Sequence, residues 1–79
     1  MNMNMDKIYI VVAECLGTDD EYTAEVYPCH TAQEAGEMAS SLIADMALAM
    51  GVENVDATRD WELEGDCWFY RVRIDEQPF

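Results

Sequence analysis

One helix signal divides this chain into three parts. Thr31 stands in the N-cap position with Glu34 three residues later, which is the spacing of a capping box, and Gly51 suits the left-handed residue that ends a helix. Apolar residues between them recur at intervals of three and four, as in an amphipathic helix. The sequence therefore predicts a helix from about Ala32 to Met50. Its buried stripe is expected to comprise Ala35, Met38, Ala39, Leu42, Met46 and Ala49, widened by Ile43 and Met50.

The residues before the helix predict a β-hairpin. Lys7–Cys15 is a β-branched and aromatic run that is apolar on both faces, as expected of an interior strand. Tyr22–Cys29 alternates, and turn-forming residues separate the two runs. Pro28 has no N–H to donate to a neighbouring strand, which favours a sheet edge or the end of a strand. The alternation predicts Tyr22, Ala24 and Val26 toward the helix, and Thr23, Glu25 and Tyr27 on the opposite face.

The residues after the helix predict a second hairpin. Val55–Glu64 and Cys67–Asp75 both alternate, and Gly65 with Asp66 suits a two-residue type II′ turn between them. This turn fixes which residues lie opposite one another. The predicted pairs are Glu64 with Cys67, Leu63 with Trp68, Glu62 with Phe69, Trp61 with Tyr70, Asp60 with Arg71 and Thr58 with Arg73.

The order of these elements predicts the fold class. Strand, strand, helix, strand, strand indicates an α+β two-layer sandwich, β-β-α-β-β, with one helix packed on a four-stranded antiparallel sheet. The order of strands within the sheet stays open. A chain of 79 residues is expected to form one domain, here residues 7–76, between a disordered start at 1–6 and a frayed end at 77–79. The sheet face away from the helix should then be open to solvent or to a partner.

The chain is strongly acidic. Seventeen acidic residues against four basic ones give a formal net charge of −13, whereas 51% of the residues are hydrophobic. The apolar content is too high for a disordered acidic tract, so the charge is expected on the surface of a folded protein. A basic partner is therefore indicated rather than direct contact with nucleic acid. Because like charges repel, we also expect added salt to stabilise the fold.

Two acidic groups are candidate partner-binding sites. Asp60, Glu62 and Glu64 would form a ladder on one strand face, with neighbouring carboxylates about 6–7 Å apart. Such a row could imitate the phosphates of a nucleic acid, and the alternative is a solvated face that only maintains solubility. The second group, at the tip of the first hairpin, lacks the ligand spacing of a calcium loop. The predicted partner-binding residues are Asp19, Asp20, Glu21, Glu25, Tyr27, Asp60, Glu62, Glu64, Asp66 and Phe69.

Aromatic residues on the predicted open face leave two alternatives. Tyr27 and Phe69 among charged residues have the mixed composition of a protein interface, which fits a foreign partner or a homodimer that buries the same face. Phe69 could instead lie beneath the long side chains of Arg71 and Arg73.

Cysteine and histidine predict no catalytic or metal site. Cys29 and His30 are adjacent on an extended segment, where neighbouring side chains point in opposite directions, so they are poorly placed as a nucleophile and base. A helix N-terminus can lower a thiol pKa, so a small enzyme or redox protein that uses Cys29 and His30 remains an alternative. Three cysteines and one histidine without short paired spacings argue against zinc, and no cofactor is expected.

The chain shows no export or membrane signal. The segment Met1–Asp6 lacks the basic region and apolar run of a secretory signal. Acidic residues and serines interrupt the longest apolar stretch, Thr31–Met50, which argues against a membrane span. The cytoplasm is the expected location.

In size, charge and compact α/β layout, the chain resembles the small phage-encoded inhibitors of bacterial defence, including anti-CRISPR and nucleic-acid-mimicking proteins. The resemblance implies stoichiometric inhibition of a nucleic-acid-binding protein by occupation of its basic groove. The sequence thus predicts a non-enzymatic acidic protein that blocks a basic, nucleic-acid-binding surface of a partner protein. The alternative is a small homodimeric structural or regulatory module.

Overall fold

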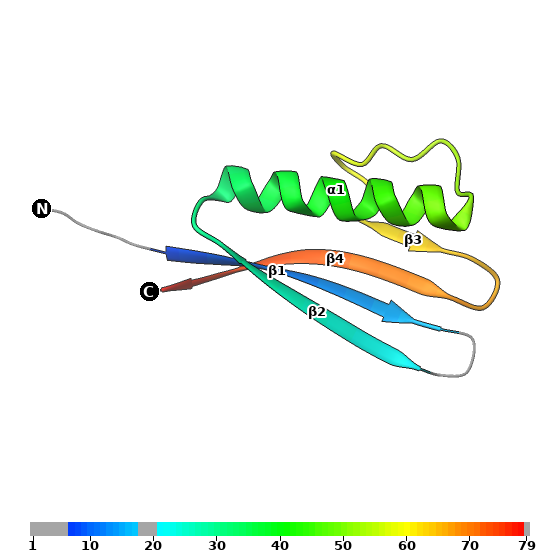
Figure 1. The fold of residues 1–79 in the computed structure, drawn as a ribbon, viewed down its shortest axis with the longest axis horizontal. Coiled ribbons are helices and arrows are strands. Elements are labelled where there is room, and N and C mark those ends of the chain that lie inside the picture. The colour runs from blue at the N-terminus through cyan, green and yellow to red at the C-terminus, as the bar shows by residue number, and fades with distance from the viewer. Residues whose placement is uncertain (1–6, 18–20, 79) are drawn as a thin grey trace, which may run out of the picture.

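A computed structural model describes residues 7–17 and 21–78 of the chain (Figure 1). One helix packs on a four-stranded antiparallel sheet, so the α+β fold and the β-β-α-β-β order predicted from the sequence are confirmed. The elements are β1 (Lys7–Leu16), β2 (Tyr22–Cys29), α1 (Ala32–Met50), β3 (Glu62–Glu64) and β4 (Phe69–Pro78).

The sheet has the strand order β2-β1-β4-β3. β1 is an interior strand, as its two apolar faces predicted, and β2 and β3 form the two edges. Gly17 N–H donates to the Glu21 carbonyl at 2.8 Å, which fixes the phase of the β1–β2 ladder. Since alternate residues of β2 bond to β1, the missing N–H of Pro28 lies on the free edge. Pro28 thus lies at a sheet edge, one of the two positions that the sequence favoured, and it is also the next-to-last residue of β2.

The two residues predicted to end the helix, Thr31 and Gly51, do cap α1. Thr31 Oγ1 accepts the Glu34 backbone N–H at 3.0 Å, and a Glu34 side-chain oxygen accepts the His30 backbone N–H at 2.9 Å. This departs slightly from a capping box, in which the glutamate would accept the N–H of the cap residue itself. Gly51 adopts the left-handed conformation, with φ of 71°. Both helix ends are therefore set by local hydrogen bonds that the sequence specifies.

The core lies between α1 and one face of the sheet. Ala35, Ala39, Ile43 and Ala47 are the buried helix residues. The row of alanines lets the helix approach the sheet closely. Ala49 and Met50 were predicted to belong to the buried stripe, but both are exposed. Opposite the helix lie Val11, Ala13, Cys29, Leu63, Tyr70 and Val72, all buried.

The predicted ten-residue strand Val55–Glu64 is wrong over most of its length. β3 has three residues, and residues 57–59 form a turn instead. Asp56 Oδ1 accepts the Thr58 backbone N–H at 3.0 Å, and Asp60 Oδ2 accepts the Asp56 backbone N–H at 3.1 Å. Short acidic side chains offer the backbone these local bonds in competition with strand pairing, so the alternation of residues 55–61 does not produce a strand.

The register of the second hairpin differs from the prediction by two residues. Glu62 lies opposite Arg71, Leu63 opposite Tyr70 and Glu64 opposite Phe69. The Gly65 N–H donates to the Trp68 carbonyl at 3.0 Å, so Asp66 and Cys67 form the tip in place of Gly65 and Asp66. A shift by two keeps each side chain on its predicted face. Tyr70 and Val72 are accordingly buried beneath α1.

The two faces of β2 were assigned the wrong way round. Tyr27 packs against the core beneath α1, whereas Tyr22 and Val26 are exposed on the opposite face of the sheet. Glu25 and Thr23 share the helix side with Tyr27 but are exposed. The open face therefore carries Tyr22, Ala24 and Val26 from β2, with Glu62, Phe69, Arg71 and Arg73 where predicted.

The C-terminal part of the chain differs from the prediction. β4 continues to Pro78, and Gln77 and Pro78, predicted as frayed, pair with Ile8 and Lys7 of β1. Residues 1–6, 18–20 and 79 lie outside the described residues, and with them the predicted disordered start.

Candidate acidic interface

Carboxylates concentrate between the end of α1 and the tip of the second hairpin. Residues 53–66, here called the acidic segment, hold six acidic residues and a single basic one, Arg59. All six acidic residues are exposed. They are Glu53, Asp56, Asp60, Glu62, Glu64 and Asp66.

Two of these carboxylates hold the turn of residues 56–60 together. Asp56 Oδ1 accepts the Thr58 hydroxyl at 2.6 Å, and Asp60 Oδ2 accepts the Asp56 backbone N–H at 3.1 Å. The hydrogen bonds from Thr58 lower the pKa of Asp56, because they favour its ionised form. Asp60 therefore belongs to this turn and not to a regular acidic ladder, although the sequence placed it with Glu62 and Glu64.

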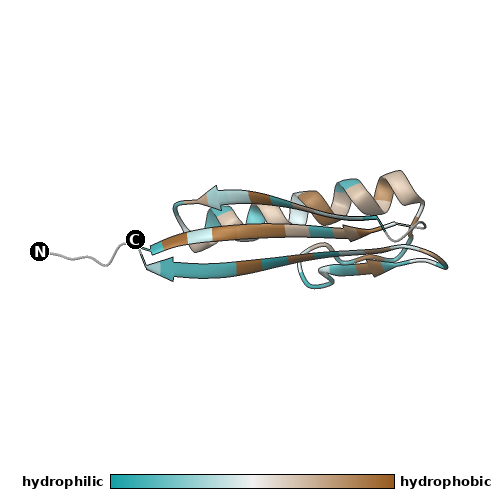
Figure 2. Cartoon of the chain, turned by 90° about the horizontal axis from the view of Figure 1, so that it is seen from below, coloured by the Kyte–Doolittle hydropathy of each residue, from teal (hydrophilic) through white to brown (hydrophobic). Residues whose placement is uncertain are grey.

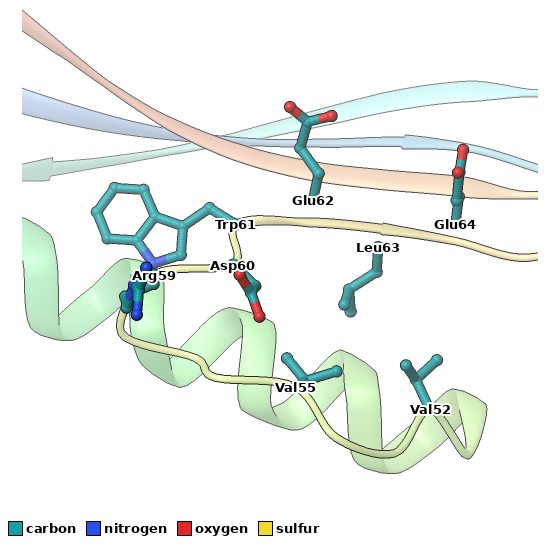
Figure 3. A pocket seen from close by; sticks show the side chains of 8 residues that line it. All are labelled: Val52, Val55, Arg59, Asp60, Trp61, Glu62, Leu63 and Glu64. Atoms are coloured by element: carbon teal, nitrogen blue, oxygen red, sulfur yellow. The ribbon is translucent and has the colours of Figure 1, made fainter.

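Glu62 and Glu64 remain as the regular part of the predicted ladder. Both are exposed on β3, and their side chains point to the side opposite Leu63, which turns toward α1 (Figure 3). Arg71 lies opposite Glu62 in the ladder, but its guanidinium bonds to Glu14 of β1 instead. Among the described residues, neither Glu62 nor Glu64 has an ion-pair partner.

A hollow runs along the free edge of β3. Its volume is about 410 Å³, and its apolar residues are Val52, Val55, Trp61 and Leu63. Asp60, Glu62 and Glu64 line the same hollow together with Arg59, so the structure does bring the three predicted carboxylates to one place. Val72 N–H donates to the Trp61 carbonyl at 2.9 Å, which leaves the backbone groups of Glu62 and Glu64 directed outward. The lining thus combines apolar residues with three carboxylates and one arginine.

The other predicted partner-binding residues are scattered over the molecule. Glu21 is exposed at the start of β2, Asp66 at the tip of the second hairpin, and Asp19 and Asp20 lie outside the described residues. Tyr27 Oη donates to Glu25 at 3.0 Å on the helix side of β2. Asp66 is the last residue of the acidic segment, whereas Glu21, Glu25 and Tyr27 lie on β2 or next to it, at the other edge of the sheet.

Phe69 is held on the open face by an arginine. The Arg71 guanidinium lies 5.6 Å from the centre of the Phe69 ring, within the range of a cation–π contact. The arrangement corresponds to the alternative in which Phe69 lies beneath arginine side chains. The ring is half-buried as a result.

An ionic cluster on the open face was missed by sequence reasoning. Glu14 Oε1 lies 3.0 Å from Arg71 Nη2 and 3.3 Å from Arg73 Nε, and Glu14 Oε2 accepts the Tyr22 hydroxyl at 2.6 Å. Hydrogen bonds from Tyr22 and Arg71 lower the pKa of Glu14 to about 2. Arg73 also pairs with Asp75 at 2.6 Å, so the cluster holds two charges of each sign. The available signal was a single acid within the apolar run of β1.

The pair Cys29 and His30 does not form an activated thiol. The Cys29 side chain is buried, and its Sγ lies 3.8 Å from the Tyr27 carbonyl. Burial, together with the charge of Glu34, raises the pKa of the Cys29 thiol above its ordinary value. A raised pKa reduces the thiolate fraction, the opposite of what nucleophilic catalysis requires. The hollow beside it, about 460 Å³ in volume, also includes His30, Glu34 and Met38.

No group of three or more His, Cys, Asp or Glu side chains within residues 7–17 and 21–78 is arranged to hold a metal ion. In the same part of the chain, no helix is long and apolar enough to cross a membrane. Comparison with known proteins found no matching family model, no similar curated protein and no similar solved structure. The function is therefore argued from the chain's own residues.

Proposed function

We infer that this protein is a non-enzymatic acidic binding protein whose acidic segment occupies a basic, nucleic-acid-binding surface of a partner protein. The observation that carries the proposal is the exposure of all six carboxylates of this segment beside one arginine. Glu62 and Glu64 are the centre of the proposed contact because they project from one strand face without an ion-pair partner among the described residues.

The distribution of basic residues supports this assignment. Lys7, Arg71 and Arg73 are each paired with a carboxylate elsewhere on the sheet. They therefore do not neutralise the acidic segment, whose field stays available to a cationic surface. The apolar residues Val55 and Trp61, which line the same hollow as the carboxylates, offer contact area that long-range attraction alone does not supply.

The proposal is tested with a charge-neutralising variant and a matched control. Glu62→Gln with Glu64→Gln removes two charges from the acidic segment with little change in side-chain shape. Glu37→Gln with Asp45→Asn removes two charges from exposed positions of α1. The immobilised wild-type protein is used to capture proteins from bacterial extract at low and high salt. Captured proteins are then tested for loss of a labelled DNA or RNA oligonucleotide by fluorescence anisotropy.

We expect capture of a basic protein at low salt and displacement of its oligonucleotide by the wild-type chain. The Glu62/Glu64 variant should bind at least about tenfold more weakly, a loss of about 1.4 kcal/mol, while the α1 variant binds like wild type. Equal binding by both variants would remove the assignment to this surface. A captured protein that retains its oligonucleotide would remove the proposed mechanism.

A further inference from the structure

The edge of the sheet formed by β2 differs from the acidic edge formed by β3. β2 is an edge strand, and no strand within residues 7–17 and 21–78 lies on its outer side. Tyr22 and Val26 are 59% and 63% exposed, respectively. Thr23 and Glu25, which point to the helix side, are exposed as well, so α1 leaves this part of the edge uncovered.

The outward backbone groups of β2 are arranged to hydrogen-bond to another strand. The hydrogen bond from Gly17 to Glu21 sets the phase of the ladder, so Thr23, Glu25 and Tyr27 bond to β1. The N–H and carbonyl groups of Tyr22, Ala24 and Val26 therefore point outward. None of these outward residues is charged, and Pro28, which cannot donate, comes only at the end of the strand. Natural sheets usually protect such edges with charged residues, proline or a bulge.

We propose that β2 pairs antiparallel with β2 of a second copy of this chain, with Ala24 opposite the partner's Ala24. This register pairs all three outward residues, because Tyr22 then lies opposite the partner's Val26. An aromatic residue opposite a β-branched one is a favourable cross-strand pair. Registers displaced by two residues in either direction lose one of these pairs. The sequence of the edge is therefore complementary to itself.

Charge opposes a second copy less at this edge than at the acidic segment. The acidic segment would repel its own copy, whereas β2 carries one acidic residue, Glu25, and Glu14 of the neighbouring β1 is paired with Arg71 and Arg73 of β4. In the proposed register Glu25 lies opposite the partner's Thr23, so like charges are not directly opposed. The contact would join two sheets into one, and the two acidic segments would lie at its far ends (Figure 1).

Apolar side chains of the open face lie next to the proposed contact. Figure 2 shows the sheet from the side away from α1. Val12 lies between Val26 and Arg73 on this face and is only 6% exposed. Val26 itself lacks an apolar neighbour on its outer side among the described residues. The partner's Tyr22 would supply that neighbour.

Sedimentation equilibrium of the full chain tests the proposal. The wild-type protein should show the mass of a dimer at high micromolar concentrations, more strongly as salt screens the net charge. Val26→Lys places a charge on the edge and should raise the dimer dissociation constant at least about tenfold. Leu48→Lys makes the same change at an apolar residue that is 84% exposed on α1, and it should dimerise like wild type.

A third variant separates edge pairing from stacking of open faces. Ala24→Pro removes an outward N–H that β1 does not use, so it should abolish the dimer while circular dichroism still shows the fold. If this variant fails to fold, hydrogen exchange of the wild-type Ala24 and Val26 amides decides, since edge pairing slows both as the dimer forms. A protein that stays monomeric into the millimolar range overturns the proposal. A dimer that survives Val26→Lys, or one whose Ala24 amide exchanges freely, also overturns it. If a strand of a foreign protein is the true occupant of this edge, the isolated chain stays monomeric.

Discussion

The two edges of this sheet end in opposite ways. β2 has eight residues, and those whose backbone groups point outward are uncharged, with Tyr22 and Val26 exposed among them. β3 has only three residues, two of which are Glu62 and Glu64, and Asp60 lies nearby. A short, charged edge discourages pairing with another strand, whereas a longer, uncharged one invites it. The comparison shows how one small sheet can hold an acidic surface and a self-complementary one without bringing like charges together.

The largest effect expected from this comparison concerns how firmly each edge is held to the core. Leu63 of β3 is 5% exposed, whereas Val26 of β2 is 63% exposed. Leu63→Ala should lower the free energy of unfolding by roughly 2–5 kcal/mol because it leaves a cavity. Val26→Ala should change it by less than about 0.5 kcal/mol in the monomer. Urea unfolding at low protein concentration measures both, and similar losses would mean that β3 is not anchored through Leu63.

Gly17 and Gly65, one in each hairpin, allow a second comparison of the two edges of the sheet. A Cβ at Gly65 would lie 2.6 Å from Trp68 Cε2, whereas a Cβ at Gly17 would meet only the Glu21 carbonyl oxygen at 3.8 Å. Gly65→Ala should therefore destabilise the protein by about 1–3 kcal/mol, since Trp68 must move. Gly17→Ala should remain within about 0.5 kcal/mol of wild type. Thermal unfolding compares the two, and a tolerated Gly65→Ala would show that Trp68 is not confined against the turn.

The ionic cluster of Glu14, Arg71, Arg73 and Asp75 should respond to acid. The pKa of Glu14 falls from 4.5 to about 2 through its bonds to Tyr22 and the two arginines. A lowered carboxyl pKa stabilises the fold above the unfolded value, and this contribution is lost as the pH falls toward the folded value. Glu14→Gln should therefore be less stable than wild type at neutral pH.

The difference between the two proteins should shrink between about pH 5 and about pH 2. Measuring unfolding of both proteins at each pH cancels the changing repulsion among the remaining carboxylates. A constant difference across this range would contradict the assigned ion pairs.

The smallest expected effect distinguishes the acidic segment from the rest of the surface. Added salt should raise the unfolding temperature of the wild-type protein because it screens the repulsion from a net charge of −13. Glu62→Gln with Glu64→Gln should weaken this salt dependence more than Glu37→Gln with Asp45→Asn does. Equal responses would mean that charge density is no greater at β3 than on α1.

The sequence predicted what local hydrogen bonds and strand periodicity determine. Thr31, Glu34 and Gly51 set the helix ends, and the limits of β2 agree with the predicted alternation. The faces of β2 were not predictable from that pattern, since Tyr22 and Val26 on one face are as apolar as Tyr27 on the other. Tertiary contact with α1 decides which face is covered.

The candidate site was predicted only in part because two signals compete in residues 55–64. Alternation favours a strand, but Asp56 and Asp60 satisfy backbone N–H groups locally and form a turn. The register of the hairpin was also ambiguous, since a shift by two residues leaves every side chain on the same face. Glu62 and Glu64 were therefore identified correctly as outward residues even though their cross-strand partners were not.

Residue-resolved hydrogen exchange at the two edges tests the contrast between them most directly. It is measured on the labelled protein at low and high concentration. The account predicts that the amides of Ala24 and Val26 become protected as concentration rises, while those of Glu62 and Glu64 exchange rapidly throughout. Free exchange at Ala24 and Val26 under all conditions, or protection that appears at Glu62 and Glu64 instead, would contradict it.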